Sequence, residues 1–149
     1  MKSLFNEAAF TEIKSRLDAL NENSERQWGK MDAAQMMNHC QEPLRIPLGK
    51  STMKKPGFLL RLMAKMYKGA MYGDKPWKKN LRTAPGFAVT DPKEFRSEKE
   101  KLSALIDEFH QMKSRETMPD HPAFGTFSKE QWGKMHYKHL DHHFRQFGV

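Results

Sequence analysis

The sequence predicts an all-α fold: a four-helix bundle with one long connection between its second and third helices. Four segments repeat apolar residues at three- and four-residue steps, which is the period of an amphipathic helix. The alternation of apolar and polar residues that marks a strand is missing almost everywhere. The chain has 149 residues, of which 38% are hydrophobic, enough for one domain with a buried core. We therefore predict a single domain over residues 1–149.

The first two predicted helices occupy the N-terminal third of the chain. Residues 4–20 have one apolar face at helical spacing and are followed by a polar loop. Asp32 can then cap a second helix that runs to about Leu48. Pro43 lies inside this helix and should bend or tighten its second half, and Gly49 is a suitable stop.

Two capping signals predict where the last two helices begin. In DPKE, Asp91 can cap a helix that has proline at its first position and that continues to about Lys113. Ser128 and Gln131 form a capping box for a last helix that runs to about Phe147.

A basic crossover, residues 49–92, joins the second and third helices and includes a short predicted helix at residues 58–71. Residues 50–82 hold ten Lys and Arg and a single acid, a charge of +9, so the rest of the chain is close to neutral within the net charge of +8. Such a segment can bind nucleic acid, an anionic membrane surface or an acidic substrate, and Trp77 lies among its lysines. No groove-reading motif accompanies it, which argues against nucleic acid.

Two other interpretations of the crossover stay open. One is a solvated basic face on an ordinary helix whose apolar side chains face the core. Those side chains are Leu59, Leu62, Met63 and Met66. The other is that a Lys or Arg of the crossover closes a pocket and attracts an anionic thiol cofactor.

The chain has the composition of a soluble, cytoplasmic protein. It contains one cysteine, so no internal disulfide can form, which suits a reducing compartment. The first residues lack the unbroken apolar run of a signal peptide, and no stretch is apolar for the length that spans a bilayer. We expect Cys40 to be a buried free thiol, and not a nucleophile.

The pentapeptide QWGKM occurs twice, at residues 27–31 and 131–135. In each copy a histidine follows the methionine by eight residues, and these histidines are His39 and His143. The first copy is predicted in the loop before the second helix, and the second copy inside the last helix. The pentapeptide therefore has no mechanism of its own, but its shared offset draws attention to the two histidines.

The last predicted helix carries histidines on one narrow face. Trp132, His136, His139, His143 and Phe147 follow one another by three or four residues. A single inward histidine is usually satisfied by a backbone carbonyl. Three on one stripe are harder to satisfy, because each unpaired ring nitrogen costs free energy when it is buried. A metal ion would take the ring lone pairs directly, and a histidine-rich polar face is the alternative.

Spacing selects among these histidines. His139 and His143 are one turn apart, about 6 Å along the axis, so their imidazoles can converge on one ion. His136 and His143 are about 10.5 Å apart by the same rise, which is too far to share an ion comfortably. His136 remains a candidate for the pocket around the ion, and His142 lies off the stripe. A third ligand must come from another helix, where His39 is the obvious candidate.

Two segments that contain these histidines resemble the DinB-like (YfiT-like) superfamily of metal-binding four-helix bundles. They are MDAAQMMNHC, at 31–40, and HYKHLDHHFRQF, at 136–147. The family pattern places one histidine on the second helix and a His-x-x-x-His pair on the fourth, followed shortly by Arg and Gln. HPAFGTFSKEQW, at 121–132, further resembles an uncharacterised branch of the superfamily.

The resemblance implies that His39, His139 and His143 hold a divalent metal ion, commonly zinc or nickel, with open positions filled by water. Arg145 and Gln146 follow the ligands within one turn and could reach the pocket or hydrogen-bond the ligands.

Characterised members of the superfamily include thiol-dependent S-transferases and a thiol-dependent isomerase. In these enzymes the metal would lower the pKa of a bound thiol and favour the thiolate. The resemblance thus implies a metal-dependent enzyme that carries out thiol-dependent transfer, or related hydrolytic or isomerase chemistry, on a small-molecule substrate. A low-molecular-weight thiol would be its cofactor. A homodimer is compatible with such a bundle, although no seam in the sequence identifies an interface.

The alternative hypothesis is a non-catalytic basic module. It would bind nucleic acid or an anionic surface through the crossover, and its histidines would only stabilise the bundle.

Overall fold

The computed structural model describes residues 1–51, 57–81, 83 and 86–149 of the chain. Within these residues it is helical, with an isolated bridge between His121 and Gly125 as its only β pairing. The elements are α1 (Glu7–Ala19), α2 (Ala33–Arg45), α3 (Phe58–Tyr72), α4 (Phe95–Gln111), the 3₁₀ turn η1 (Met112–Ser114) and α5 (Lys129–Gln146). The predicted all-α fold, with a short extra helix in the crossover, is confirmed. Among the described residues, every helix is too short or too polar to span a lipid bilayer.

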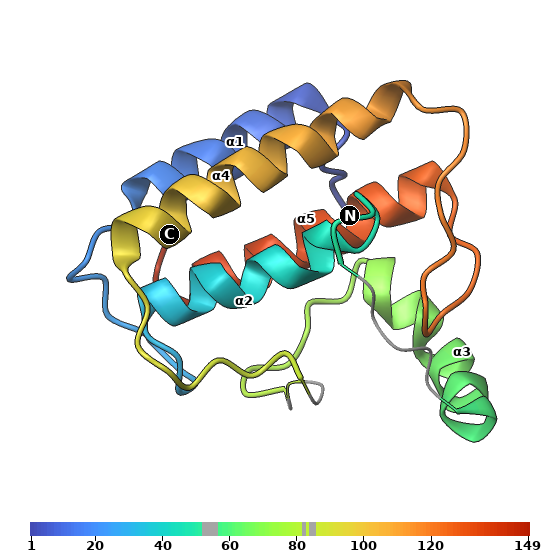
Figure 1. The fold of residues 1–149 in the computed structure, drawn as a ribbon, viewed down its shortest axis with the longest axis horizontal. Coiled ribbons are helices and arrows are strands. Elements are labelled where there is room, and N and C mark those ends of the chain that lie inside the picture. Colours follow the sequence, from blue (N-terminus) through green and yellow to red (C-terminus); the bar gives the residue numbers. More distant parts are fainter. Residues whose placement is uncertain (52–56, 82, 84–85) are drawn as a thin grey trace.

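Helices α1, α2, α4 and α5 form the bundle, and α3 extends away from it (Figure 1). Both α1 and α2 pack against α4 and α5, so the core lies among these four helices. The apolar stripes predicted from the sequence supply most of that core. Its fully buried side chains include Ile13, Leu17, Met36, Leu44, Leu102, Ile106, Phe109, Trp132 and Phe144.

Capping side chains fix where two of the bundle helices begin. The Asp32 carboxylate accepts from the backbone N–H of Gln35, whose own side chain accepts from the Asp32 N–H. Ser128 and Gln131 make the same reciprocal pair at the start of α5, as predicted. Each box satisfies donors that a helix start would leave unpaired, and so fixes the register of the histidines that follow.

The predicted start of α4 at Asp91 is wrong. The helix begins at Phe95, and its cap is Glu94, whose carboxylate accepts from the N–H groups of Arg96 and Ser97. The Asp91 carboxylate instead pairs with the Lys93 ammonium at 2.5 Å. It is therefore engaged elsewhere, and the unpaired donors of the first turn are satisfied three residues later.

The prediction that the apolar side chains of the crossover helix face the core is also wrong. Leu59 is 70% exposed, Leu62 52%, Met63 50% and Met66 81%. Helix α3 reaches the bundle through its contact with α5. Its apolar face therefore remains in solvent.

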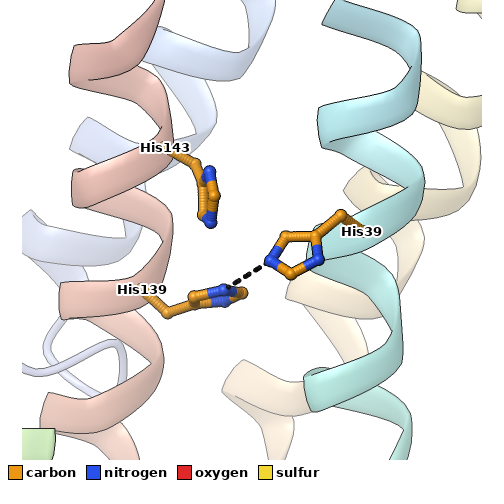
Figure 2. Close-up of side chains that lie close together, drawn as sticks. All are labelled: His39, His139 and His143. Carbon is orange, nitrogen blue, oxygen red and sulfur yellow. Dashed lines mark hydrogen bonds between the residues drawn. The ribbon is translucent and has the colours of Figure 1, made fainter. Parts of the chain in front are cut away.

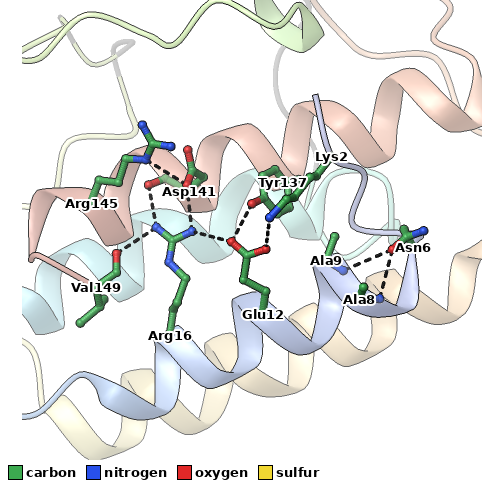
Figure 3. Close-up of polar contacts among 10 residues, drawn as sticks. All are labelled: Lys2, Asn6, Ala8, Ala9, Glu12, Arg16, Tyr137, Asp141, Arg145 and Val149. Atoms are coloured by element: carbon green, nitrogen blue, oxygen red, sulfur yellow. Dashed lines mark hydrogen bonds and ion pairs between the residues drawn. The ribbon is translucent and has the colours of Figure 1, made fainter.

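A polar network joins α1 to the half of α5 that carries the histidines (Figure 3). The Arg16 guanidinium donates to the Asp141 carboxylate at 2.8 Å and to the C-terminal Val149 carbonyl at 2.9 Å. The Tyr137 hydroxyl donates to Glu12 at 2.9 Å. Arg16 and Asp141 are both largely buried, so this pair holds the register between the two helices more firmly than a surface pair would.

Candidate metal centre

Three histidines from two helices converge beside the core. His39 lies on α2, His139 and His143 lie one turn apart on α5, and their rings point toward one another (Figure 2). One ring nitrogen of each lies within 4.8 Å of the other two, and the Nε2 atoms of His39 and His139 are 3.2 Å apart. A tetrahedral zinc ion with Zn–N bonds of about 2.0 Å separates its ligand nitrogens by about 3.3 Å. Small side-chain movements would therefore suffice to hold such an ion.

Hydrogen bonds fix the protonation of two of the three rings. His39 Nδ1 donates to the backbone carbonyl of Phe87 at 2.8 Å. His143 Nδ1 donates to Gln146 Oε1 at 3.1 Å, and Gln146 Nε2 donates in turn to the Trp28 carbonyl at 2.7 Å. Because each acceptor places the ring proton on Nδ1, the Nε2 lone pairs of His39 and His143 are free for an ion.

The third ring is held differently. Within the described part of the chain, nothing hydrogen-bonds to the buried Nδ1 of His139. Its Nε2 can donate to the unprotonated Nε2 of His39 across their 3.2 Å contact. To bind an ion through Nε2, His139 must therefore carry its proton on Nδ1, so it is the ligand whose protonation is least fixed in advance.

Burial keeps the cluster uncharged. It lowers the pKa of His39, and it lowers the pKa of His143 to about 3, with repulsion from His39 adding to the effect. Burial and the neighbouring rings also hold the pKa of His139 well below its usual range. At neutral pH the cluster therefore presents three neutral imidazoles. A divalent ion held by such ligands would keep its full charge.

The family comparison covers all of these residues. The chain matches the model of a family described as "Protein of unknown function (DUF1569)" over residues 5–148. The chain belongs to this family. No curated protein and no solved structure shows a significant match to it. Both helices that carry the histidine cluster lie inside the matched region of this DUF1569 chain.

A cavity of about 360 Å³ lies beside the cluster, and all three histidines line it. The other side chains on its wall are mostly apolar. They come from α2, from α5, from the end of α3, from the rest of the crossover and from the loop before α5, and include Ile46, Met71, Trp77, Leu81, Phe87, Phe124 and Met135. The three rings therefore border a space that suits an apolar small molecule.

Two contributions of the crossover to this site were missed from the sequence. Trp77, a residue of the basic segment, lies in the cavity wall, with its ring centre 5.9 Å from that of His139. The carbonyl of Phe87 orients His39. A tryptophan within a polar segment was the available signal for the first, whereas a backbone carbonyl has no signature in the sequence.

His121 is a third cavity residue that spacing did not reveal. Its Nδ1 accepts from the backbone N–H groups of Ala123 and Phe124, at 3.1 and 3.3 Å. The ring proton is therefore on Nε2, which makes that nitrogen a hydrogen-bond donor. Burial lowers the pKa of His121 to about 4, so the ring is neutral at pH 7.

The three residues that the sequence predicts around the metal ligands, His136, Arg145 and Gln146, lie in different surroundings. His136 lines the cavity with its ring stacked on Trp132, and burial lowers its pKa to about 3. Gln146 contacts His143 directly, because its side-chain oxygen accepts from the His143 ring. Arg145 does not line this cavity: it pairs with Asp141 at 3.1 Å and borders a second, more polar cavity of about 600 Å³.

Other histidines and the cysteine have ordinary surroundings. His110 is buried and donates from Nδ1 to the Leu4 carbonyl at 2.8 Å, which is how a core imidazole is usually satisfied. His142 lies off the stripe, as predicted, and contacts the rings of Trp28 and Trp77. Cys40 is fully buried and its pKa is raised by burial, as expected for an inert thiol.

Proposed function

We propose that this protein is a divalent-metal-dependent enzyme that acts on a small, largely apolar molecule. The observation that carries the proposal is the convergence of His39, His139 and His143 beside a cavity. Structural zinc sites usually close four protein ligands around the ion, whereas catalytic sites use three and leave a position for water or substrate. Three ligands next to a cavity favour the catalytic arrangement.

The neutral ligand set favours Lewis-acid chemistry, because the charge of the ion would not be cancelled by the protein. Imidazole ligands suit zinc and nickel, the metals that the DinB-like resemblance implies. The same resemblance favours a low-molecular-weight thiol as cofactor. Cys40 is the only cysteine of the chain and is fully buried, so a reacting thiol would have to come from a bound small molecule. Thiol-dependent transfer is therefore the first reaction class to test, followed by related isomerase and hydrolytic reactions.

Residues of this chain would support such chemistry in two ways. The apolar wall, which includes Trp77 and Phe124, would exclude water from the reacting groups. His121, protonated on Nε2, could donate a hydrogen bond to a polar group of the substrate.

Metal content provides the first test. Protein purified without a histidine tag from metal-replete cells should contain about one zinc or nickel ion per chain, measured by elemental mass spectrometry. His143→Ala should lose most of this metal. His142→Ala is the matched control, because His142 also lines the cavity but lies outside the cluster, and it should keep the metal. Wild-type protein with far less than one ion per chain would overturn the proposal.

The reaction class requires a second experiment. The metal-loaded protein is mixed with a panel of low-molecular-weight thiols and an electrophilic acceptor, and loss of the thiol is followed by mass spectrometry. Turnover that His143→Ala abolishes would support thiol transfer. Full metal content without turnover of any thiol would redirect the search to hydrolytic and isomerase substrates.

A further inference from the structure

Helix α3 presents a continuous apolar face to solvent. Six large apolar side chains of α3 are exposed among those that the structure describes, with exposed fractions between 50% and 82%. On a wheel of about 100° per residue, five of them (Phe58, Leu59, Leu62, Met63 and Met66) fall within one arc of about 140°, and Tyr67 lies about 40° beyond its edge. Exposed apolar side chains are common singly, but a contiguous group on one helix usually marks an interaction site.

The C-terminal end of α3 is anchored to the bundle. The buried Lys138 ammonium of α5 donates to the carbonyls of Ala70 and Gly73, at 2.8 and 2.7 Å. The Trp77 indole N–H also donates to the Ala70 carbonyl, at 2.9 Å. These bonds satisfy the last carbonyls of α3, where a cation is also favoured by the helix dipole. The first turns of the helix therefore project from the bundle on a fixed base (Figure 1).

The positive charges on α3 indicate which kind of partner fits this face. The exposed Arg61 and Lys65 both lie along one edge of the apolar arc, and residues 57–73 contain no Asp or Glu. A second copy of the chain placed symmetrically on this face would bring the same cations toward one another, which is unfavourable. Nucleic acid would use the cations but leave the aliphatic side chains uncovered. An anionic lipid surface complements both features.

We propose that α3 is an interfacial helix that docks the protein on an anionic bilayer surface. Its apolar face would enter the boundary between headgroups and acyl chains, and Arg61 and Lys65 would contact the lipid phosphates. The helix would lie in the plane of the interface. This inference does not depend on the metal centre, since none of the three histidines lies on α3.

Vesicle co-flotation tests this inference. The full chain is mixed with vesicles of phosphatidylcholine and phosphatidylserine, and separately with vesicles of phosphatidylcholine alone. We expect binding to the mixed vesicles at low salt and much weaker binding to the neutral ones. Leu59→Ser combined with Met66→Ser should lower the partition coefficient at least about tenfold. Lys65→Gln should lower it about fivefold.

Two control variants carry matched changes away from α3. Leu81→Ser replaces an exposed leucine in the loop beyond the helix, which borders the cavity at the histidines but lies outside the apolar arc of α3, and Arg96→Gln removes one exposed charge from α4. Both should change the partition coefficient by less than about twofold, because neither side chain would meet the lipid. An equal loss with Lys65→Gln and Arg96→Gln would show that net charge alone drives binding, and would overturn a specific role for α3.

Other occupants of the face would appear as different results. If the wild-type chain binds neither vesicle, the inference is wrong. If it instead forms a dimer by light scattering, and Leu59→Ser combined with Met66→Ser returns it to a monomer, the face is an interface between copies. If it binds a labelled single-stranded oligonucleotide and no vesicles, the basic segment serves nucleic acid.

Discussion

The two copies of QWGKM have the same five residues and different structures. Residues 27–31 form an irregular loop, whereas residues 131–135 lie within α5. The likeness extends further, because a serine stands three residues before the glutamine in both copies, as Ser24 and Ser128. Both copies therefore carry the Ser-x-x-Gln pattern of a capping box, but only the second copy forms one.

The backbone of the first copy hydrogen-bonds to the C-terminal end of α5. The Gln27 N–H donates to the Gln146 carbonyl at 2.7 Å, and the Trp28 carbonyl accepts from the Gln146 side chain at the same distance. Gly29 adopts φ +83°, which interrupts any helix there. The Ser24 hydroxyl accepts from Asn21 and does not cap. This loop therefore satisfies the last turn of α5 and orients the amide that holds His143.

The second copy places its residues in the core. Trp132 is fully buried, and its indole N–H donates to the Pro119 carbonyl at 3.0 Å. The Gly133 carbonyl accepts from the Leu4 N–H at 3.0 Å, which fastens the N-terminal segment against α5. The two copies thus act at opposite ends of the same helix, one on packing and one on the histidine cluster. A short sequence takes its structure and role from its surroundings.

The largest expected difference lies between the two tryptophans. Trp132→Ala should lower the free energy of unfolding by about 3–5 kcal/mol, because it removes a fully buried ring and leaves a cavity. Trp28→Ala should cost about 1 kcal/mol or less, because that ring is only partly buried. Urea denaturation of both variants measures the difference. Equal losses would mean that the loop copy is as structurally important as the helical one.

The surroundings of the two copies should also differ in how strongly they make the stability of the fold depend on pH, since each tryptophan contacts a different histidine. His136, stacked on Trp132, has a folded pKa of about 3 against an ordinary value near 6.5. The unfolded chain therefore binds the proton more readily. The stability that neutral His136 contributes is present above about pH 6.5 and is lost as the pH falls toward 3.

This loss amounts to about 2 kcal/mol between pH 7 and pH 5. His136→Leu should flatten the fall in stability over that interval, as measured by urea denaturation at each pH. His142→Leu, beside Trp28, should flatten it less, because His142 is only partly buried. An unchanged slope in His136→Leu would contradict the assignment of a neutral buried ring.

The two glycines should respond in different measurements. In Gly133→Ala the new Cβ would lie 2.1 Å from Ser3 Oγ and 2.8 Å from the Phe5 ring, so we expect a loss of about 1–2 kcal/mol in stability. In Gly29→Ala the residue is strained at φ +83°, and its Cβ would lie 2.4 Å from Gln146 Nε2. That variant should also weaken metal binding, measured by competition with a chelator. If metal binding weakened in Gly133→Ala but not in Gly29→Ala, the assignment of the loop copy to the histidine cluster would be wrong.

The smallest expected effect concerns Gln146, which links the loop copy to the histidine cluster. Gln146→Ala removes the acceptor that holds the His143 ring proton on Nδ1. Metal affinity should fall about tenfold, within the range seen when the hydrogen-bond partner of a ligand is removed. Arg145→Ala is the matched neighbour, because Arg145 is half-exposed and borders a different cavity. An equal fall in both variants would mean that the effect comes from disturbing the helix end.

The sequence alone determined what depends on neighbours three or four positions apart. It located the four bundle helices, the caps at Asp32 and Ser128, and the face shared by His139 and His143. Such features follow from the geometry of one helix turn, so a periodic pattern is enough to predict them. It also pointed to His39, through a shared offset and a resemblance, but it could not supply the distance between His39 and His139.

Only the tertiary structure decided what depends on distant segments. His39 meets His139 across 100 positions of the chain, and the Phe87 carbonyl that orients His39 lies 48 positions away. The exposure of the apolar face of α3 belongs to the same class. Its periodic pattern is that of a core helix, but the path of the crossover carries it away from the bundle. A pattern of residues states which face of a helix is apolar, whereas the packing of the rest of the chain decides what covers that face.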